Sequence, residues 1–295
     1  SAAVDIAAGL AKSGLRPIVA IYSTFMQRCF DQIFQEVALQ NLPVVLCMDR
    51  AGLVGGDGAT HHGFCDITTT RCLPNMTLMA PMDANELTEA LKFAVQSGLP
   101  CAIRYPRDRA EEVEQMAVDY HSPPFELGKA AWVRNGRDAV VLAYGNAACE
   151  ALIAAETLAE EGIDLGVISA RFAKPLDEKI LHKLLADGHN MPIITMEENT
   201  LVGGFGSAVL EFAQQHRLDA RKITRIGLPD RLIDQDTRQG QLEQVGLTRQ
   251  NLIKQVRQLL NKDNDESNEK KTDCPANKPG QTPDHPGRTG TARMA

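Results

Sequence analysis

The sequence predicts an α/β fold made of two doubly wound domains, the first with a parallel sheet, followed by a disordered tail. Short apolar runs of strand length alternate with longer segments of helical spacing, which is typical of a parallel sheet covered by helices. An acidic stretch that contains Pro123 and Pro124 interrupts this alternation near the middle of the chain. We therefore expect domains over residues 1–112 and 129–261, joined by a linker over 113–128.

The first domain alternates strands and helices in a regular order. We expect a helix over 3–12, a strand over 16–21, a helix over 27–40, strands over 43–48 and 76–80, a helix over 85–96 and a strand over 101–105. Asp83 is placed to cap the helix over 85–96, and Gly98 to end it. These segments predict the first sheet and its covering helices.

The second domain repeats this plan without a shared sequence period. We expect strands over 139–143, 165–169, 193–197 and 223–227, and helices over 147–161, 177–186, 205–216 and 248–260. Residues 262–295 are mostly polar and cannot bury enough apolar surface to offset the entropy of ordering them. We predict that this tail is disordered.

Composition excludes several classes of function. The net charge of −7 argues against binding to nucleic acid or to an anionic membrane surface. No run approaches the roughly 18–20 apolar residues that span a bilayer, and the N-terminus shows no secretory signal. The seven cysteines follow no metal-binding spacing, so we expect reduced thiols in a cytoplasmic protein.

Polar residues gather where the predicted strands of the first domain end. A glycine-rich loop over 55–63 contains Asp57 and His61, and glycines let the backbone approach a ligand closely. Histidine titrates near neutral pH and can move a proton at a carbonyl or hydroxyl group. Arg50 and Arg107 follow two strands, at the sheet edge where open α/β folds bind ligands. Two converging guanidinium groups there would neutralise a phosphate; structural ion pairs are the alternative.

Two strings in this region point to a family. The string Tyr-Ser-Thr-Phe-Met-Gln-Arg over 22–28 and the string Asp-Arg-Ala-Gly to Thr-His-His-Gly over 49–63 resemble the pyrimidine-binding domain of the 1-deoxy-D-xylulose-5-phosphate synthase family, within the transketolase superfamily. The segments 170–177 and 197–207 are similar to its C-terminal domain. The resemblance covers residues 1 to about 260, roughly the second half of the family's protein.

The resemblance implies a reaction and its participants. Pyruvate would be decarboxylated and its two-carbon unit transferred to glyceraldehyde 3-phosphate, giving a precursor of isoprenoids and thiamine. The family uses thiamine diphosphate and Mg²⁺ and forms homodimers. No metal ligand is expected in this chain, since the diphosphate and metal sites belong to a domain outside it, and we expect the isolated chain to be inactive.

The resemblance also implies roles for seven residues. Phe25 would stack on the cofactor's aminopyrimidine ring, with Arg28 beside it. His61 and Arg28 would assist proton transfer and the binding of carboxylate or carbonyl groups. The substrate-binding residues implied are Tyr22, Arg50, Asp57, His61 and Arg107, with Arg50 and Arg107 holding the acceptor phosphate. His62 is the alternative to His61.

The chain departs from the family pattern at several positions. The family's activating glutamate would lie one position ahead of Ser1, and Ala2 stands where the family has a histidine. Asp108 follows Arg107 where the family usually has glycine. Asp57 and Asn85 also match the spacing of a magnesium-binding pattern, although this short pattern often occurs by chance.

Three alternatives remain open at this point. The chain could be the C-terminal subunit of a split transketolase or the beta subunit of a 2-oxo-acid dehydrogenase. It could also be a non-catalytic dimerisation module.

Overall fold

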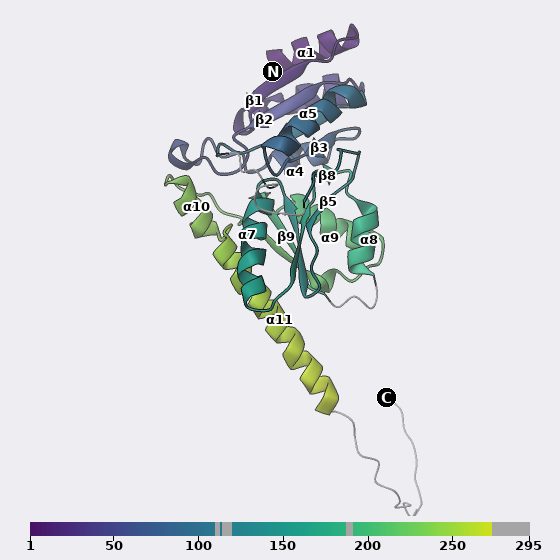
Figure 1. Cartoon of the computed structure of the whole chain (residues 1–295). Coiled ribbons are helices and arrows are strands. Elements are labelled where there is room, and N and C mark those ends of the chain that lie inside the picture. The colour runs from purple at the N-terminus through teal and green to yellow at the C-terminus, as the bar shows by residue number, and fades with distance from the viewer. Residues whose placement is uncertain (110–112, 114–119, 187–190, 273–295) are drawn as a thin grey trace, which may run out of the picture. The chain divides into compact units, whose positions relative to one another are not determined.

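Two five-stranded sheets organise the protein, whose computed structural model describes residues 1–109, 113, 120–186 and 191–272, with side chains up to residue 261 (Figure 1). Each sheet has four parallel strands and one antiparallel edge strand. The predicted pair of α/β folds is therefore confirmed. The antiparallel edges are additions that the sequence pattern did not reveal.

The first sheet has the strand order β1–β2–β4–β3–β8. Its strands are β1 (Ile18–Tyr22), β2 (Val45–Asp49), β4 (Cys101–Arg104), β3 (Thr77–Met79) and β8 (Phe172–Lys174). The central strands β2 and β4 are almost wholly buried, as expected for a parallel sheet with both faces covered. Register places Tyr22 opposite Asp49, so β1 and β2 end side by side.

The first half of the chain also contains eight helical segments among the described residues. They are α1 (Ala2–Lys12), α2 (Ser23–Met26), η1 (Gln27–Cys29), α3 (Phe30–Gln32), η2 (Ile33–Ala38), η3 (Gly55–Asp57), α4 (Asp66–Arg71) and α5 (Ala84–Ser97). The predicted cap of α5 is confirmed, because the Asp83 carboxylate accepts the Glu86 N–H at 2.8 Å and Gly98 ends the helix with φ of 69°.

The helix predicted over 27–40 differs in two ways. Helical backbone begins earlier, at Ser23, and its hydrogen bonding changes from α to 3₁₀, back to α, and then to π before Ala38. The apolar spacing correctly places Ile33, Val37 and Ala38 on the buried side, but it also includes Phe30, which is 42% exposed. The spacing of apolar residues does not determine which carbonyl each backbone N–H bonds to, so the changes of helix type were not predicted.

The second sheet has the order β10–β9–β6–β7–β5. Its strands are β10 (Ile223–Leu228), β9 (Ile193–Thr200), β6 (Ala139–Tyr144), β7 (Leu165–Ser169) and β5 (Ala131–Arg134). The helical segments are α7 (Ala147–Glu160), α8 (Glu178–Leu185), α9 (Phe205–Gln215), η4 (Ala220–Lys222), α10 (Arg238–Val245) and α11 (Arg249–Thr272).

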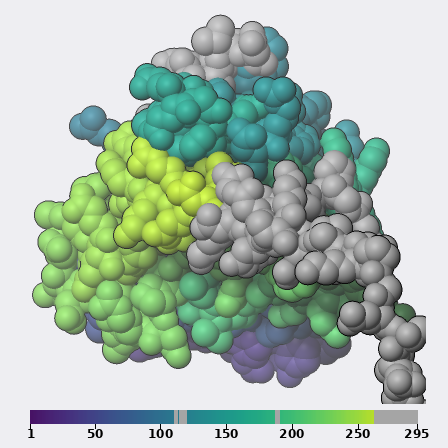
Figure 2. Space-filling model, turned by 90° about the horizontal axis from the view of Figure 1, so that it is seen from below, coloured from purple at the N-terminus to yellow at the C-terminus, as the bar shows by residue number. Residues whose placement is uncertain are grey.

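Two apolar cores cover the faces of this sheet. Helices α8 and α9 pack on one face, through residues such as Leu181 and Val209. Helix α7 and the start of α11 pack on the other face, through residues such as Leu152 and Leu252. In Figure 2 the yellow surface of α11 lies beside the teal and green surface of the second half of the chain. The structure thus confirms the predicted layered arrangement.

Helix α11 continues beyond the predicted boundary at residue 260 and reaches Thr272. The rest of the tail predicted to be disordered, 273–295, lies outside the described residues, as do 110–112 and 114–119 at the predicted linker. None of the helices within the described ranges has the length and apolar character needed to cross a bilayer.

Strand β8 connects the two halves of the chain. Although it lies in the second half of the sequence, it pairs antiparallel with β3, with Lys174 opposite Leu78 and Phe172 opposite Met79. Residues 1–260 accordingly form one compact unit. Among the described residues, the elements missed by the sequence prediction are α4, β5, β8 and α10 and the short helical turns η3 and η4.

A buried ion pair stands next to this connection. Arg171 and Glu86 are both almost fully buried, and their Nε and Oε1 atoms lie 2.6 Å apart. Arg171 also donates to the Ser122 hydroxyl and to the carbonyl of Pro123, and its guanidinium lies 4.4 Å from the Phe125 ring centroid. Burial raises the pKa of Glu86, although the charge of Arg171 opposes this shift. Arg171, which lies between β7 and β8, thereby connects the segment 122–125 to α5.

Candidate functional site

An aromatic cluster stands at the end of β1. The Tyr22 and Phe25 rings stack with centroids 5.4 Å apart, and the His61 ring contacts Phe25 edge-on at 5.5 Å. Phe25 is 48% exposed. The structure therefore brings together three of the predicted site residues and leaves an aromatic surface open for a planar ligand.

Arg50 completes this cluster from the end of β2. Its guanidinium lies 3.7 Å from the Tyr22 ring centroid and forms a 2.6 Å ion pair with Asp49. The Arg50 backbone has φ of 57°, a left-handed conformation that non-glycine residues rarely adopt. The buried Nε atom of Arg50 has no hydrogen-bond partner among the described residues. A strained backbone and an unpartnered buried donor are features that concentrate at ligand sites.

Asp57 and Arg107 form a second, separate pair. Their side chains meet at 2.7 Å and are substantially exposed. The two arginines have different partners, because Arg107 is paired with Asp57 and Arg50 with Asp49. The convergence of the two arginines on one phosphate therefore stays a prediction.

Arg28 lies apart from both pairs. Its side chain is exposed, and within the described ranges no hydrogen bond or ion pair engages it. Its carbonyl accepts a hydrogen bond from the Ser1 hydroxyl at 3.1 Å, which places it beside the start of α1. Arg28 is thus available to an anionic ligand.

The two neighbouring histidines have different surroundings. His61 is partly exposed, and its Nδ1 lies 2.9 Å from the Thr60 hydroxyl oxygen. His62 is buried, and its Nδ1 accepts the Val54 N–H at 3.2 Å. This leaves the proton on Nε2, which donates to the Ile233 carbonyl at 3.2 Å. The geometry favours His61 as the site histidine and His62 as a structural residue.

This arrangement predicts a pH-dependent stability. Burial lowers the pKa of His62 from its usual value of about 6.5, so the unfolded chain binds a proton more readily than the folded chain. The free energy of unfolding should therefore fall as pH drops below about 6.5. His62→Leu should lose about 1–3 kcal/mol at pH 7, by leaving the Val54 N–H unpaired, and show a shallower acid-side fall in urea titrations. The control is His121→Gln, at an exposed histidine; an unchanged acid-side fall in His62→Leu would contradict the assignment.

Asp57 and Asn85, which match the spacing of a magnesium-binding pattern, have different surroundings in the structure. The Asp57 carboxylate is paired with Arg107, and Asn85 is an exposed residue of the first turn of α5. Within the described ranges, no three acidic, histidine or cysteine side chains gather as a metal site would require. The spacing is therefore explained by a loop and a helix start.

The second half of the chain holds the segment 52–63 in place, which the sequence analysis missed. Glu198 of β9 accepts the Leu53 N–H at 2.7 Å, and Gln241 of α10 accepts the Gly55 N–H at 2.8 Å. Gly52 has φ of 84°, and a Cβ atom there would lie 2.3 Å from a Glu198 carboxylate oxygen. No local sequence signal connects residues so distant along the chain.

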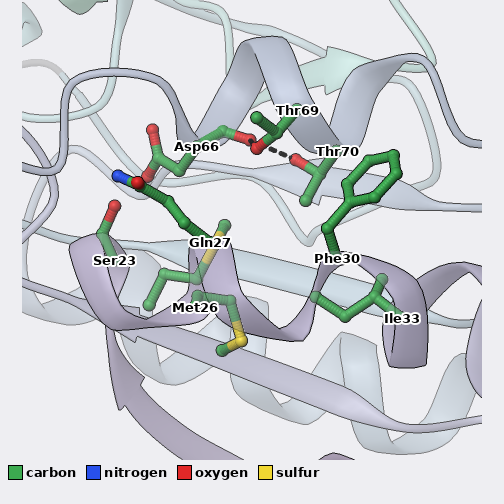
Figure 3. A pocket seen from close by; sticks show the side chains of 9 residues that line it. Ser23, Met26, Gln27, Phe30, Ile33, Asp66, Thr69 and Thr70 are labelled. Atoms are coloured by element: carbon green, nitrogen blue, oxygen red, sulfur yellow. Dashed lines mark hydrogen bonds between the residues drawn. The ribbon is translucent and has the colours of Figure 1, made fainter. Parts of the chain in front are cut away.

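A small pocket lies beside the cluster, on another face of the same helical run. Its lining residues Ser23, Met26, Gln27, Phe30 and Ile33 follow helical spacing, and Asp66, Thr69 and Thr70 of α4 face them (Figure 3). None of the predicted site residues lines it. We place the site at the aromatic cluster because polar and aromatic groups of four segments meet there.

Family models agree with this arrangement. The model for the transketolase pyrimidine binding domain matches residues 1–112, and the model for the transketolase C-terminal domain matches residues 128–252. The chain belongs to the transketolase family. The first match contains all seven predicted site residues, and the second contains Glu198, Arg238 and Gln241.

Curated relatives narrow the resemblance within the transketolase family. The chain is 49% identical over 259 residues to the 1-deoxy-D-xylulose-5-phosphate synthase of Rhodopirellula baltica, and 46% identical over 258 residues to that of Aquifex aeolicus. Each match covers 88% of this chain but only 39% and 40% of the respective relative. The predicted resemblance to the C-terminal part of these synthases is confirmed, and the chain spans about two fifths of their length.

Solved structures show the same two-domain fold. A split gene transketolase, described as an inactive beta4 tetramer, superposes with a TM-score of 0.77 at 29% identity, covering 88% of this chain and 81% of that chain. The transketolase of Campylobacter jejuni superposes with a TM-score of 0.67 at 18% identity, covering 86% of this chain and 37% of that chain. The latter likeness concerns the fold alone.

Proposed function

We propose that this chain supplies the pyrimidine-binding and C-terminal domains of a 1-deoxy-D-xylulose-5-phosphate synthase. Together with a diphosphate-binding domain, it would condense pyruvate with glyceraldehyde 3-phosphate, releasing CO₂. The observation that carries the proposal is the contact of Tyr22, Phe25 and His61, with Arg50 over Tyr22, at the carboxyl ends of β1 and β2. The identity to named synthases supports this reaction over others of the transketolase family.

The residues present fit the pyrimidine end of thiamine diphosphate. The exposed face of Phe25 suits a planar heterocycle, and the buried Nε atom of Arg50, whose guanidinium lies over the Tyr22 ring, has no hydrogen-bond partner among the described residues. When bound, this cofactor supplies the carbon nucleophile that protein side chains lack. The ligands of its diphosphate and of Mg²⁺ are assigned to the diphosphate-binding domain.

Side chains of this chain would carry out proton transfer and substrate binding. His61, beside the exposed Phe25 face, would move a proton at a substrate oxygen. Arg28 would bind the pyruvate carboxylate, and Asp57 and Tyr22 the acceptor hydroxyls. Arg50 and Arg107 would bind the acceptor phosphate, which would replace carboxylates that now occupy their guanidinium groups. Binding therefore exchanges existing ion pairs for new ones.

The wider setting follows from the same proposal. We place the protein in the cytoplasm, in isoprenoid and thiamine precursor synthesis, as a homodimer. Helix α1 carries the exposed apolar residues Ile6 and Leu10, which suits burial against another subunit.

A second candidate function is the C-terminal subunit of a split transketolase. The specific observation in its favour is the superposition on the split gene transketolase, with a TM-score of 0.77 over 88% of this chain. The two candidates differ in donor substrate, and the lower identity of 29% makes this candidate the second choice.

The test is an assay of the chain with and without the diphosphate-binding part of the Rhodopirellula baltica synthase. We expect deoxyxylulose phosphate from pyruvate and glyceraldehyde 3-phosphate, with thiamine diphosphate and Mg²⁺, only in the combined sample. Product from a ketose phosphate donor but not from pyruvate would favour the split transketolase. No product from either donor, with association of the parts verified, would refute both.

A further inference from the structure

One arginine of the second half connects the two segments that carry the Asp57–Arg107 pair. Arg238, the first residue of α10, donates from Nη1 and Nη2 to the two carboxylate oxygens of Glu198, at 2.5 and 2.8 Å. Its Nη1 also donates to the Leu53 carbonyl at 2.5 Å, and its Nε to the Asp108 carboxylate at 2.8 Å. All three guanidinium nitrogens are therefore engaged.

The contacts of Arg238 lie immediately beside proposed substrate-binding residues. Leu53 lies shortly before Asp57 in the same loop, and Asp108 directly follows Arg107 in the sequence. Asp57 and Arg107 face one another at 2.7 Å, and Arg238 contacts the Leu53 backbone carbonyl on one side of this pair and the Asp108 side-chain carboxylate on the other. It also explains why Asp108 is compatible with a phosphate site, since its carboxylate is occupied by Arg238.

Charge and burial make this connection rigid. Arg238 and Glu198 have side chains that are 14% and 5% exposed, so neither is freely hydrated. Burial opposes the charge of Arg238, but Glu198 and Asp108 more than compensate and raise its pKa. A planar guanidinium can satisfy three partners at fixed angles, whereas a lysine ammonium acts as a single point charge.

We propose that Arg238 is a positioning residue for the acceptor site, setting the separation of Asp57 and Arg107 without touching substrate. This inference rests on the proposed function, because it concerns recognition of a phosphorylated acceptor. It assigns to the C-terminal domain a part in acceptor specificity. The donor side, around Phe25 and Arg28, does not depend on these contacts.

The kinetic test uses Arg238→Lys in the combined enzyme. Small misplacements of binding groups cost on the order of 10–100-fold, so we expect the KM for glyceraldehyde 3-phosphate to rise by about that factor. The pyruvate KM should stay close to wild type. The preference for glyceraldehyde 3-phosphate over unphosphorylated glyceraldehyde, as a ratio of kcat/KM values, should fall, which a merely structural defect would not cause. Arg257→Lys, in the exposed pair with Glu161, is the matched control.

Amide hydrogen exchange supplies a readout that does not require activity. In Arg238→Lys, peptides that contain Leu53 and Gly55, or residues 105–109, should exchange faster than in wild type or Arg257→Lys. Peptides of β6 should be unchanged. If the combined wild-type enzyme makes no product, the proposed function fails, and the exchange result alone decides whether Arg238 holds the two segments.

Two outcomes would overturn the proposal. One is unchanged exchange in both segments together with unchanged acceptor preference; the other is an equal loss of kcat/KM for both acceptors. Should Arg238→Lys fail to fold, Asp108→Asn replaces it, because this change removes only the charge at the Arg107 side. Asp108→Asn is expected to shift acceptor preference in the same direction and by less.

Discussion

Replacing His61 by glutamine should lower the kcat for deoxyxylulose phosphate formation by about 10²–10⁴-fold, the usual contribution of a positioned general acid or base. The structure places the His61 ring against the exposed Phe25 ring, so the side chain faces the proposed reaction site. Glutamine preserves hydrogen bonding but cannot exchange a proton near neutral pH. Steady-state kinetics of the combined enzyme, with the acid limb of its pH profile, measure the effect.

Two controls separate chemistry from folding in this prediction. His61→Gln should unfold at the wild-type temperature, because His61 is partly exposed and its side chain hydrogen-bonds to its neighbour Thr60. His216→Gln replaces the exposed histidine that directly follows α9 and should leave kcat unchanged. Wild-type kcat in His61→Gln would remove this residue from the mechanism.

Arg171→Met should cause the largest loss of stability, about 3–5 kcal/mol, the usual result of removing one partner of a buried ion pair. Glu86 would remain buried without its guanidinium partner, and the contacts to Ser122, Pro123 and Pro124 would be lost. Methionine keeps an unbranched side chain, so packing changes little. The shift in the urea unfolding midpoint measures the loss.

The exposed ion pair of Arg137 and Asp164 provides the comparison. Arg137→Gln removes a charge that is 89% exposed and should change stability by less than about 1 kcal/mol. Adding Glu86→Gln to Arg171→Met should recover part of the loss, because the buried charge is removed. Equal effects of Arg171→Met and Arg137→Gln would show that the buried pair contributes no more than a surface pair.

The elements predicted most accurately are those that combine a clear periodicity with recognisable start and stop residues. The helix over 85–96 has a capping Asp83 and a terminating Gly98, and α5 occupies Ala84–Ser97. Weakly patterned elements were missed for physical reasons: α4 contains three successive β-branched threonines, α10 contains Gly240 and little apolar periodicity, and β8 has only three residues. Tertiary contacts rather than local preference stabilise these elements.

The candidate site was predictable only in part. Tyr22 and Phe25 lie three residues apart after one strand, and His61 lies in a loop with a strong family resemblance, so their proximity could be expected. The partner of Arg107 could not be, because Asp57 lies 50 residues away whereas Asp108 is the direct neighbour of Arg107. Glu198 and Arg238 are 145 and 185 residues from their partner Leu53, and no periodic pattern connects such positions.

The pairing of β8, from the second half of the chain, with β3 of the first half has consequences for how this protein evolves and how it folds. The family matches divide the chain into two modules, yet Leu78 and Met79 of the first module pair with a strand from the second. The first module alone would present β3 as an open sheet edge, the kind of surface through which proteins aggregate. Each family domain is therefore smaller than the unit that we expect to fold cooperatively. Recombination that exchanges one domain between relatives must preserve the pairing of β3 with β8.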